Sequence, residues 1–315
     1  MNKRILITGA TSFTGAHIAR ALGDAGFQVV ATLTRRLVHY SDPLIQKRRE
    51  YSQISEWIEE APFGSARMIE AIRSIQPHIF VNHGADIKGY RQPDFDYLGS
   101  VAASLTGLRP VVEALASSGC QRWIHTGSIF EPDEGEAGLQ PTPSAEAMSI
   151  YGVSKSMVWQ PVRFFAVKSG LKVSKIIIPN PVGPFENPDR MIPFFVKTWK
   201  SGGVPTLKTP QLIRDNIPAS WLARTYVDEA QWGDSGRDSV RIRRPSGYAL
   251  SNEAFLQLFV KNFEHLMDHG LPFEIAPQIV DEPLKRINTE PCPELMNEAD
   301  RHRFWEEWAT SVGRW

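Results

Sequence analysis

The sequence has few groups that could bind a metal or form a disulfide. Its only cysteines, Cys120 and Cys292, lie far apart, and no His/Cys spacing is typical of a zinc site. Basic and acidic residues are equal in number, 35 of each, so no overall charge favours nucleic acid or an anionic membrane. No run of about 20 apolar residues is present for a membrane helix. We therefore expect no metal, no nucleic-acid partner and no membrane partner.

The N-terminus also lacks the apolar core of a signal peptide. Lys3 and Arg4 precede a short apolar run that ends at a glycine turn. We therefore expect a cytoplasmic location. A chain of 315 residues, 42% of them hydrophobic, is long enough for one large domain or two unequal ones.

Short apolar runs alternate with helical patterns over the first 185 residues. One long helix is expected to carry the apolar positions from Val101 to Leu115. This alternation predicts an α/β fold, a Rossmann-type doubly wound parallel sheet covered on both faces. Ligands bind such sheets at the carboxyl ends of the strands. The expected strands are residues 4–7, 27–31, 79–81, 122–125 and 173–178.

Frequent prolines break the pattern after about residue 186. Helices are expected near 194–199, 252–266 and 301–308, the last with an aromatic packing face. We predict a dinucleotide-binding domain at 1–185, with a contribution from about 210–235, and a smaller, mostly helical substrate lobe at 186–315. Arg241 to Arg244 alternate like an exposed strand of that lobe, either solvated or offering a phosphate contact.

The segment ITGATSFTG places glycines where the first strand turns into a helix. Gly9 permits a tight turn and Gly15 lets the helix pack closely, so the helix N-terminus can receive a pyrophosphate. Ser12 stands where a middle glycine is usual. Two readings stay open for Ser12, a tolerated substitute or a hydroxyl that donates to the phosphate, beside that of an ordinary strand-to-helix turn.

The end of the second strand bears on the choice of cofactor. An acid there typically holds the ribose of NAD, whereas an arginine accommodates the 2′-phosphate of NADP. The sequence has no acid at this point and instead reads Thr34-Arg35-Arg36. This favours NADP(H) over NAD, with Arg35 as the main contact, unless the two arginines are only solvated.

Tyr151 and Lys155 lie four residues apart, hence on one face of a predicted helix. A phenol has an unperturbed pKa of about 10, and a neighbouring ammonium favours the phenolate. We therefore expect Lys155 to lower the pKa of Tyr151, which then acts as a general acid or base. Ser128, after the fourth strand, is the expected hydroxyl that orients the substrate, with Thr126 as an alternative.

These motifs together resemble the extended short-chain dehydrogenase/reductases, the nucleotide-sugar epimerase/dehydratase/reductase group. The resemblance covers roughly the first 225 residues. It is carried by TGATSFTG at 8–15, TGSIFE at 126–131, YGVSK at 151–155, IPNPVGPFENPDRMIP at 178–193 and RDNIPASWLA at 214–223.

The resemblance implies an enzyme with the catalytic set Ser128, Tyr151 and Lys155. It implies a nucleotide-sugar substrate contacted by Glu131, Asn180, Asn187, Arg190 and Arg214. It also favours a homodimer through helices at about 100–118 and 151–169. The predicted cofactor-binding residues are Gly9, Thr11, Ser12, Phe13, Gly15, Thr34, Arg35, Arg36, Gly84, Ala85, Tyr151, Lys155, Pro179 and Val182.

Two roles stay open for each of two further side chains, Glu131 and His83. Glu131 either bonds a sugar hydroxyl or caps the loop after Ser128. His83 either touches the nicotinamide or is a hydrogen-bonded structural histidine.

The segment around Ser128 narrows the reaction. The acid/base pair of the group's dehydratases is replaced by Ile129 and Phe130, and TGSIFE is more similar to the corresponding segment of 4-keto-6-deoxyhexose reductases. We predict NADPH-dependent reduction of the C4 ketone of a nucleotide-diphospho-4-keto-6-deoxyhexose, with the proton from Tyr151. The alternatives are an NAD-dependent nucleotide-sugar 4-epimerase, a reductase of a small non-nucleotide ketone or aldehyde, and a non-catalytic NADP-binding sensor.

Overall fold

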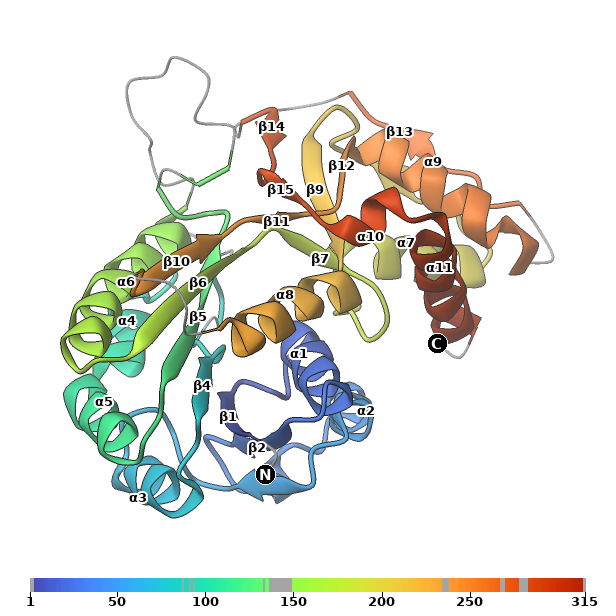
Figure 1. The fold of residues 1–315 in the computed structure, drawn as a ribbon. Helices are drawn as coiled ribbons and strands as arrows, with labels where there is room; N and C mark the ends of the chain where they lie inside the picture. Colours follow the sequence, from blue (N-terminus) through green and yellow to red (C-terminus); the bar gives the residue numbers. More distant parts are fainter. Residues whose placement is uncertain are drawn as a thin grey trace.

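A seven-stranded parallel sheet forms the centre of the molecule (Figure 1). The computed structural model describes residues 3–86, 88–90, 92, 94–132, 134–135, 149–233, 238–266, 270–277 and 283–313. The strand order is β10-β6-β5-β4-β1-β2-β3, and every neighbouring pair is parallel. The strands are β1 (Arg4–Thr8), β2 (Gln28–Thr32), β3 (Glu56–Ile58), β4 (Ile79–Asn82), β5 (Arg122–Ser128), β6 (Lys172–Ile178) and β10 (Val240–Arg243).

Helices cover both faces of this sheet, because the strands carry apolar side chains on both sides. Alternate residues of β1 divide between two cores, Ile5 and Ile7 in one and Leu6 in the other. One face is covered by α1 (Phe13–Asp24), α2 (Pro43–Ser52) and α8 (Ala219–Gln231); the other by α3 (Ala66–Ile75), α4 (Tyr97–Leu105), α5 (Leu108–Ser117) and α6 (Ile150–Lys168) (Figure 1). The predicted Rossmann-type fold is confirmed.

The C-terminal lobe contains helices together with several short strands. Its core is continuous with that of the α1/α8 face, where Phe304, Trp305 and Trp308 form the predicted packing face. The helices are α7 (Met191–Lys200), α9 (Asn252–Phe263), η3 (Glu264–Leu266), α10 (Pro293–Met296) and α11 (Glu298–Gly313). The strands are β7 (Asn180–Val182), β8 (Thr206–Leu207), β9 (Ile213–Pro218), β11 (Pro245–Ser246), β12 (Tyr248–Ser251), β13 (Glu274–Ile275), β14 (Lys285–Arg286) and β15 (Glu290–Pro291).

The single long helix predicted from Val101 to Leu115 is wrong. The segment forms α4 and α5, separated by Thr106 and Gly107. Gly107 has a φ of +74°, and a Cβ there would lie 2.5 Å from the carbonyl oxygen of Gly64. Because a loop distant in sequence presses on this point, the two glycines approach closely and the helix is interrupted.

The strand predicted around Arg241 exists but belongs to the central sheet, not to the small lobe. Residues Val240–Arg243 pair in parallel with β6 as β10, the edge strand. Arg243 forms ion pairs with Glu229 of α8 and with Glu290. These contacts within the protein replace the phosphate contact that we considered.

No helix in the described ranges is long and apolar enough to cross a membrane. Of the predicted dimer helices, α4 and α6 expose several apolar side chains, Leu98, Met157 and Phe164.

Candidate active site

Ser128, Tyr151 and Lys155 come together at the carboxyl end of β5. Ser128 is the last residue of that strand, and the other two lie on the first turns of α6. Gly152 allows this approach, because a Cβ there would lie 1.7 Å from the carbonyl oxygen of Phe130. A glycine between the tyrosine and the lysine therefore lets α6 pack directly on the loop after Ser128.

The environment of Tyr151 is largely apolar. Its ring packs against Tyr90 and Phe130, with centroid distances of 5.1 and 6.2 Å, and its side chain hydrogen-bonds that of Ser128. Burial raises the pKa of Tyr151 above its ordinary value, Tyr90 and Glu131 raise it further, and the Ser128 hydrogen bond lowers it. Our expectation that Lys155 lowers the pKa of Tyr151 is therefore wrong for this structure, where desolvation dominates.

Lys155 is itself buried, with 8% of the residue exposed. Burial lowers the pKa of Lys155 to about 8, while Glu131 raises it and Lys175 lowers it. The pKa of this lysine is therefore close to neutral pH, as is often found for a group that transfers protons.

The glycine turn has the geometry that a dinucleotide site needs. Gly9 has a φ of +72°, and a Cβ there would lie 2.7 Å from the backbone of Gly84 after β4. At Gly15 a Cβ would lie 2.2 Å from the carbonyl oxygen of Gly9. Among the described residues no group accepts a hydrogen bond from the backbone amides of Phe13 and Thr14, at the start of α1. These amides fit a pyrophosphate, so the turn is suited to NAD or NADP.

Ser12 is the N-cap of α1. Its hydroxyl donates to the carbonyl oxygen of Gly9 at 2.8 Å and accepts from the amide of Gly15 at 3.1 Å. The hydroxyl proton of Ser12 therefore bonds within the turn, which favours the tolerated substitute, and a direct contact of Ser12 with the phosphate stays a prediction. Of the other predicted residues here, Thr11 is half-buried, Phe13 is buried against His17, and Ala85 is exposed.

His83 joins the glycine turn to β5. Its Nε2 lies 2.9 Å from Thr14 Oγ1 and 3.2 Å from Ser12 Oγ, and its Nδ1 lies 3.0 Å from Thr126 Oγ1. Thr126 in turn hydrogen-bonds Tyr226 of α8 at 2.7 Å. Burial, with a further contribution from Lys155, lowers the pKa of His83 to about 3, so the ring is neutral. The structural reading of His83 accounts for these contacts, and the Thr126 hydroxyl is engaged in the same network.

The predicted adenosine end shows an aromatic contact. Arg35 lies over the ring of Tyr40, 5.0 Å from its centroid, and Thr34 hydrogen-bonds the Tyr40 hydroxyl at 3.1 Å. Thr34, Arg35 and Arg36 are all exposed. The exposed guanidinium of Arg35 thus lies over the buried ring of Tyr40, beyond the end of β2.

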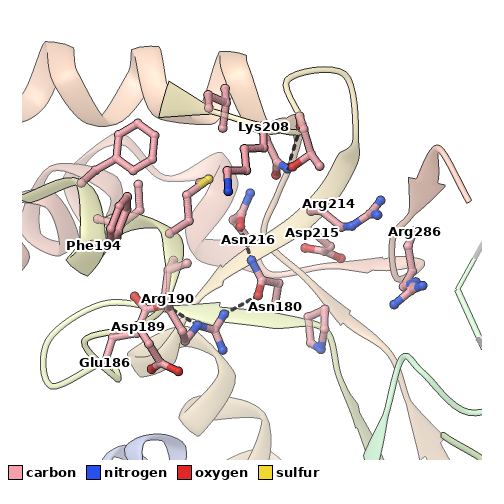
Figure 2. Close-up of a pocket in the computed structure, with 18 of the residues that line it drawn as sticks. Asn180, Glu186, Asp189, Arg190, Phe194, Lys208, Arg214, Asp215, Asn216 and Arg286 are labelled. Atoms are coloured by element: carbon pink, nitrogen blue, oxygen red, sulfur yellow. Dashed lines mark hydrogen bonds and ion pairs between the residues drawn. The ribbon is translucent and has the colours of Figure 1, made fainter. Parts of the chain in front are cut away.

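A cavity of about 500 Å³ opens beside Ile129 and Phe130, which directly follow Ser128 (Figure 2). Figure 2 shows Arg214 and Arg286 on one side of it and Lys208 and Phe194 on the other. The two arginines are register partners on the adjacent strands β9 and β14. The cavity is therefore lined by several cationic side chains, which suits a ligand with a diphosphate.

Three of the five predicted substrate residues, Asn180, Arg190 and Arg214, line this cavity. Arg190 forms an ion pair with Glu186 and donates to the side chain of Asn180 (Figure 2). Arg214 donates to backbone carbonyls of Ile213, Pro283 and Leu284. Pro179 and Val182, predicted to contact the cofactor, also line the cavity.

The other two predicted substrate residues do not line it. Asn187 accepts a hydrogen bond from Arg48 of α2 at 2.7 Å, so its side-chain oxygen holds the 183–190 loop. Glu131 is 2% exposed, accepts from the Ser128 amide and pairs with Lys175. Of the two roles considered for Glu131, these contacts correspond to capping of the loop after Ser128.

Sequence reasoning missed Lys208, Asn216 and Arg286, all of which line the cavity. Asn216 lies two residues after Arg214, so alternation along a strand could have indicated it. Arg286 has no comparable signal, since only its pairing with β9 brings it beside Arg214.

Residues 5–227 match the model of the NAD dependent epimerase/dehydratase family. The chain belongs to this family. The match confirms the predicted extended short-chain dehydrogenase/reductase group and its class of enzyme.

Among the relatives, UDP-glucuronate 4-epimerase 1 of Arabidopsis thaliana is 23% identical over 239 residues, covering 74% of this chain and 54% of that protein. The chain thus spans about half the length of this relative. UDP-glucose 4-epimerase of Neisseria meningitidis serogroup A is 25% identical over 306 residues, 88% of this chain and 86% of that protein.

The fold is also that of known epimerase structures. UDP-glucuronic acid 4-epimerase from Bacillus cereus, solved with UDP-glucuronic acid and NAD, superposes with a TM-score of 0.72 at 16% identity and covers 99% of both chains.

Proposed function

We propose that this protein is an NAD-dependent 4-epimerase of a nucleotide-diphosphate sugar. The observation that carries the proposal is the cavity beside Ile129 and Phe130, the two residues that follow Ser128, with Arg214, Arg286 and Lys208 on its walls. A diphosphate needs such cations, while the Ser-Tyr-Lys set needs a hydroxyl or ketone beside it. The relatives named as 4-epimerases support this reaction over the reductase that we first predicted.

The residues present fit a nicotinamide dinucleotide, with the amides of Phe13 and Thr14 toward its pyrophosphate and Tyr151 and Lys155 toward its nicotinamide end. When bound, the cofactor would accept a hydride from the sugar C4 and return it to the opposite face. Tyr151 would take the proton of the C4 hydroxyl and give it back. Ser128 would donate a hydrogen bond to the same oxygen, and Lys155 would hold the nicotinamide ribose.

The proposal is tested by incubating the purified protein with UDP-glucose, UDP-glucuronate and UDP-N-acetylglucosamine and following the C4 epimers by proton NMR. We expect interconversion without net oxidation of cofactor and, in D₂O, no deuterium at C4. Tyr151→Phe should lower the rate by about 10²–10⁴-fold. The matched control is Tyr248→Phe. Tyr248 is a buried tyrosine of the C-terminal lobe, so this variant should remain active.

A second candidate is the NADPH-dependent reductase, favoured by the exposed Arg35 on Tyr40. Titration with NAD and NADP distinguishes the two, since an epimerase binds NAD more tightly. Stoichiometric loss of NADPH absorbance with a nucleotide-4-keto-6-deoxyhexose, together with no epimerisation, would establish the reductase instead.

The homodimer also stays a prediction. Leu98 of α4 and Met157 and Phe164 of α6 are apolar side chains exposed on the helices that we expect at its interface.

A further inference from the structure

A buried ion pair lies beside the end of β5, where Ser128 is the last residue. Lys175 Nζ of β6 is 2.6 Å from Glu131 Oε2, and the two side chains are 4% and 1% exposed. The other carboxylate oxygen, Oε1, accepts the backbone amide of Ser128 at 2.8 Å. Both oxygens of Glu131 are therefore committed inside the protein, one of them to the catalytic serine.

The neighbouring residues provide the space for this pair. A Cβ at Gly127 would lie 2.7 Å from Lys175 Cε and 2.9 Å from Glu131 Oε1. The ammonium of Lys175 also lies 5.2 Å from the centroid of the Trp159 ring of α6. Two desolvated charges are costly to hold, and apolar residues of similar volume often serve stability as well or better. Stability alone is therefore a weak explanation for the pair.

Both charges act on Lys155, in opposite directions. Glu131 raises the pKa of Lys155 and Lys175 lowers it. Among the described residues, His83 and His125 also interact with Lys155. Burial and Lys155 lower the pKa of both histidines, and Lys175 lowers that of His125 further, so both rings are neutral. The charge around the lysine is thus set mainly by the balance of Glu131 against Lys175.

We propose that Glu131 and Lys175 form a positioning pair for the catalytic residues, in which the carboxylate fixes the backbone of Ser128 and the two charges together balance Lys155. The roles of Ser128 and Lys155 rest on the proposed function. Because both side chains are almost fully buried, they are positioning residues and not catalytic ones.

The positioning of Ser128 is tested with two double variants of equal charge, E131Q/K175M and E131L/K175M. Glutamine keeps an oxygen that can accept the Ser128 amide, whereas leucine removes it. We expect kcat to fall about tenfold or more in E131L/K175M relative to E131Q/K175M, with the KM for the nucleotide sugar changed less than about threefold. Equal kcat values in the two proteins would overturn the proposal that Glu131 positions Ser128.

The charge balance is tested with the single variants E131Q and K175M. The midpoint of Lys155 is read without turnover by trace acetylation with acetic anhydride across pH, with mass spectrometry of the Lys155 peptide. In E131Q the midpoint should move to lower pH because only Lys175 remains beside the lysine. In K175M the midpoint should not move to lower pH, and in E131Q/K175M the midpoint should return toward the wild-type value. An unchanged midpoint in E131Q, or a lower one in both single variants, would overturn the proposal.

A matched control is Glu229→Gln. Glu229 is fully buried and paired with Arg243, but it lies on α8 at the opposite face of the sheet. Its replacement should lower stability without moving the Lys155 midpoint. Failure of the wild-type protein to epimerise any sugar, with the E131Q midpoint still shifted, would reject the proposed function and leave the charge balance standing.

Discussion

At the scale of single residues, Ser12 shows how a departure from a motif is accommodated. A glycine at this place would leave the amide of Gly15 without its side-chain acceptor, which Ser12 Oγ supplies. The hydroxyl proton is used within the turn, on Gly9. The serine thus caps α1 while the amides of Phe13 and Thr14 stay available to a phosphate.

Replacement of Ser12 by alanine should therefore affect stability more than cofactor binding. Loss of an N-cap oxygen costs about 1 kcal/mol. We expect the free energy of unfolding, measured by urea titration, to fall by about that amount and the Kd for NAD to change less than about threefold. Ser65→Ala removes the equivalent cap of α3, where Ser65 Oγ accepts from Met68, and should cost a similar amount. A much weaker Kd in Ser12→Ala alone would show a direct contact with the phosphate.

At the scale of elements, the site depends on how closely α6 packs on the loop after β5. Gly152 permits the contact, since its neighbour is the carbonyl of Phe130. Tyr151 and Lys155 flank this point on the same helix. Any side chain at position 152 must push the helix away and carry both proposed catalytic residues with it.

Gly152→Ala is accordingly expected to damage both stability and activity. We expect a loss of about 1–3 kcal/mol in unfolding free energy from overpacking, and about a 10²-fold lower kcat because the catalytic groups move. Gly23→Ala is the matched control. Gly23 lies in α1 with nothing within 4 Å of a Cβ, so alanine there should stabilise the protein by about 0.5–1 kcal/mol. A fully active Gly152→Ala enzyme would refute the packing argument.

At the scale of the whole molecule, the buried side chain of His17 connects the two parts of the chain. His17 of α1 donates through Nε2 to the carbonyl of Pro184 and accepts through Nδ1 from the Tyr51 hydroxyl. Both nitrogens of the neutral ring therefore have a hydrogen-bond partner, and protonation of Nδ1 would break the bond from the Tyr51 hydroxyl. Burial lowers the pKa of His17 to about 4 from its ordinary 6.5.

This shift predicts a loss of stability on acidification. Between pH 6.5 and 4 the unfolded chain binds a proton at His17 that the folded protein does not, so unfolding becomes easier as the pH falls. From pH 7 to 5 the cost is about 2 kcal/mol for this residue. Urea titrations at the two pH values should show that difference reduced in His17→Gln, whose amide can keep both hydrogen bonds.

Other groups also titrate in this range, so the comparison with the variant is needed. His83 acts in the same direction as His17. Glu186 acts oppositely between pH 4.5 and 7, because burial raises its pKa to about 7. An identical pH dependence in wild type and His17→Gln would contradict the assignment.

The sequence by itself determined the parallel sheet, the glycine turn and the placement of Tyr151 and Lys155 on one helix face. Each depends on local spacing, such as the alternation of apolar runs or the four-residue interval on one helix face. Local patterns report backbone preference and periodicity directly, so these predictions needed no knowledge of distant neighbours.

Only the tertiary structure decided the features that depend on contacts between distant segments. Gly64 and Gly107 meet and divide the expected long helix, β14 brings Arg286 beside Arg214, and Lys175 draws Glu131 away from the substrate cavity. Side-chain partners of this kind follow from how strands pair and helices pack. Propensity and spacing along the chain carry no information about which distant atoms will fill the same space.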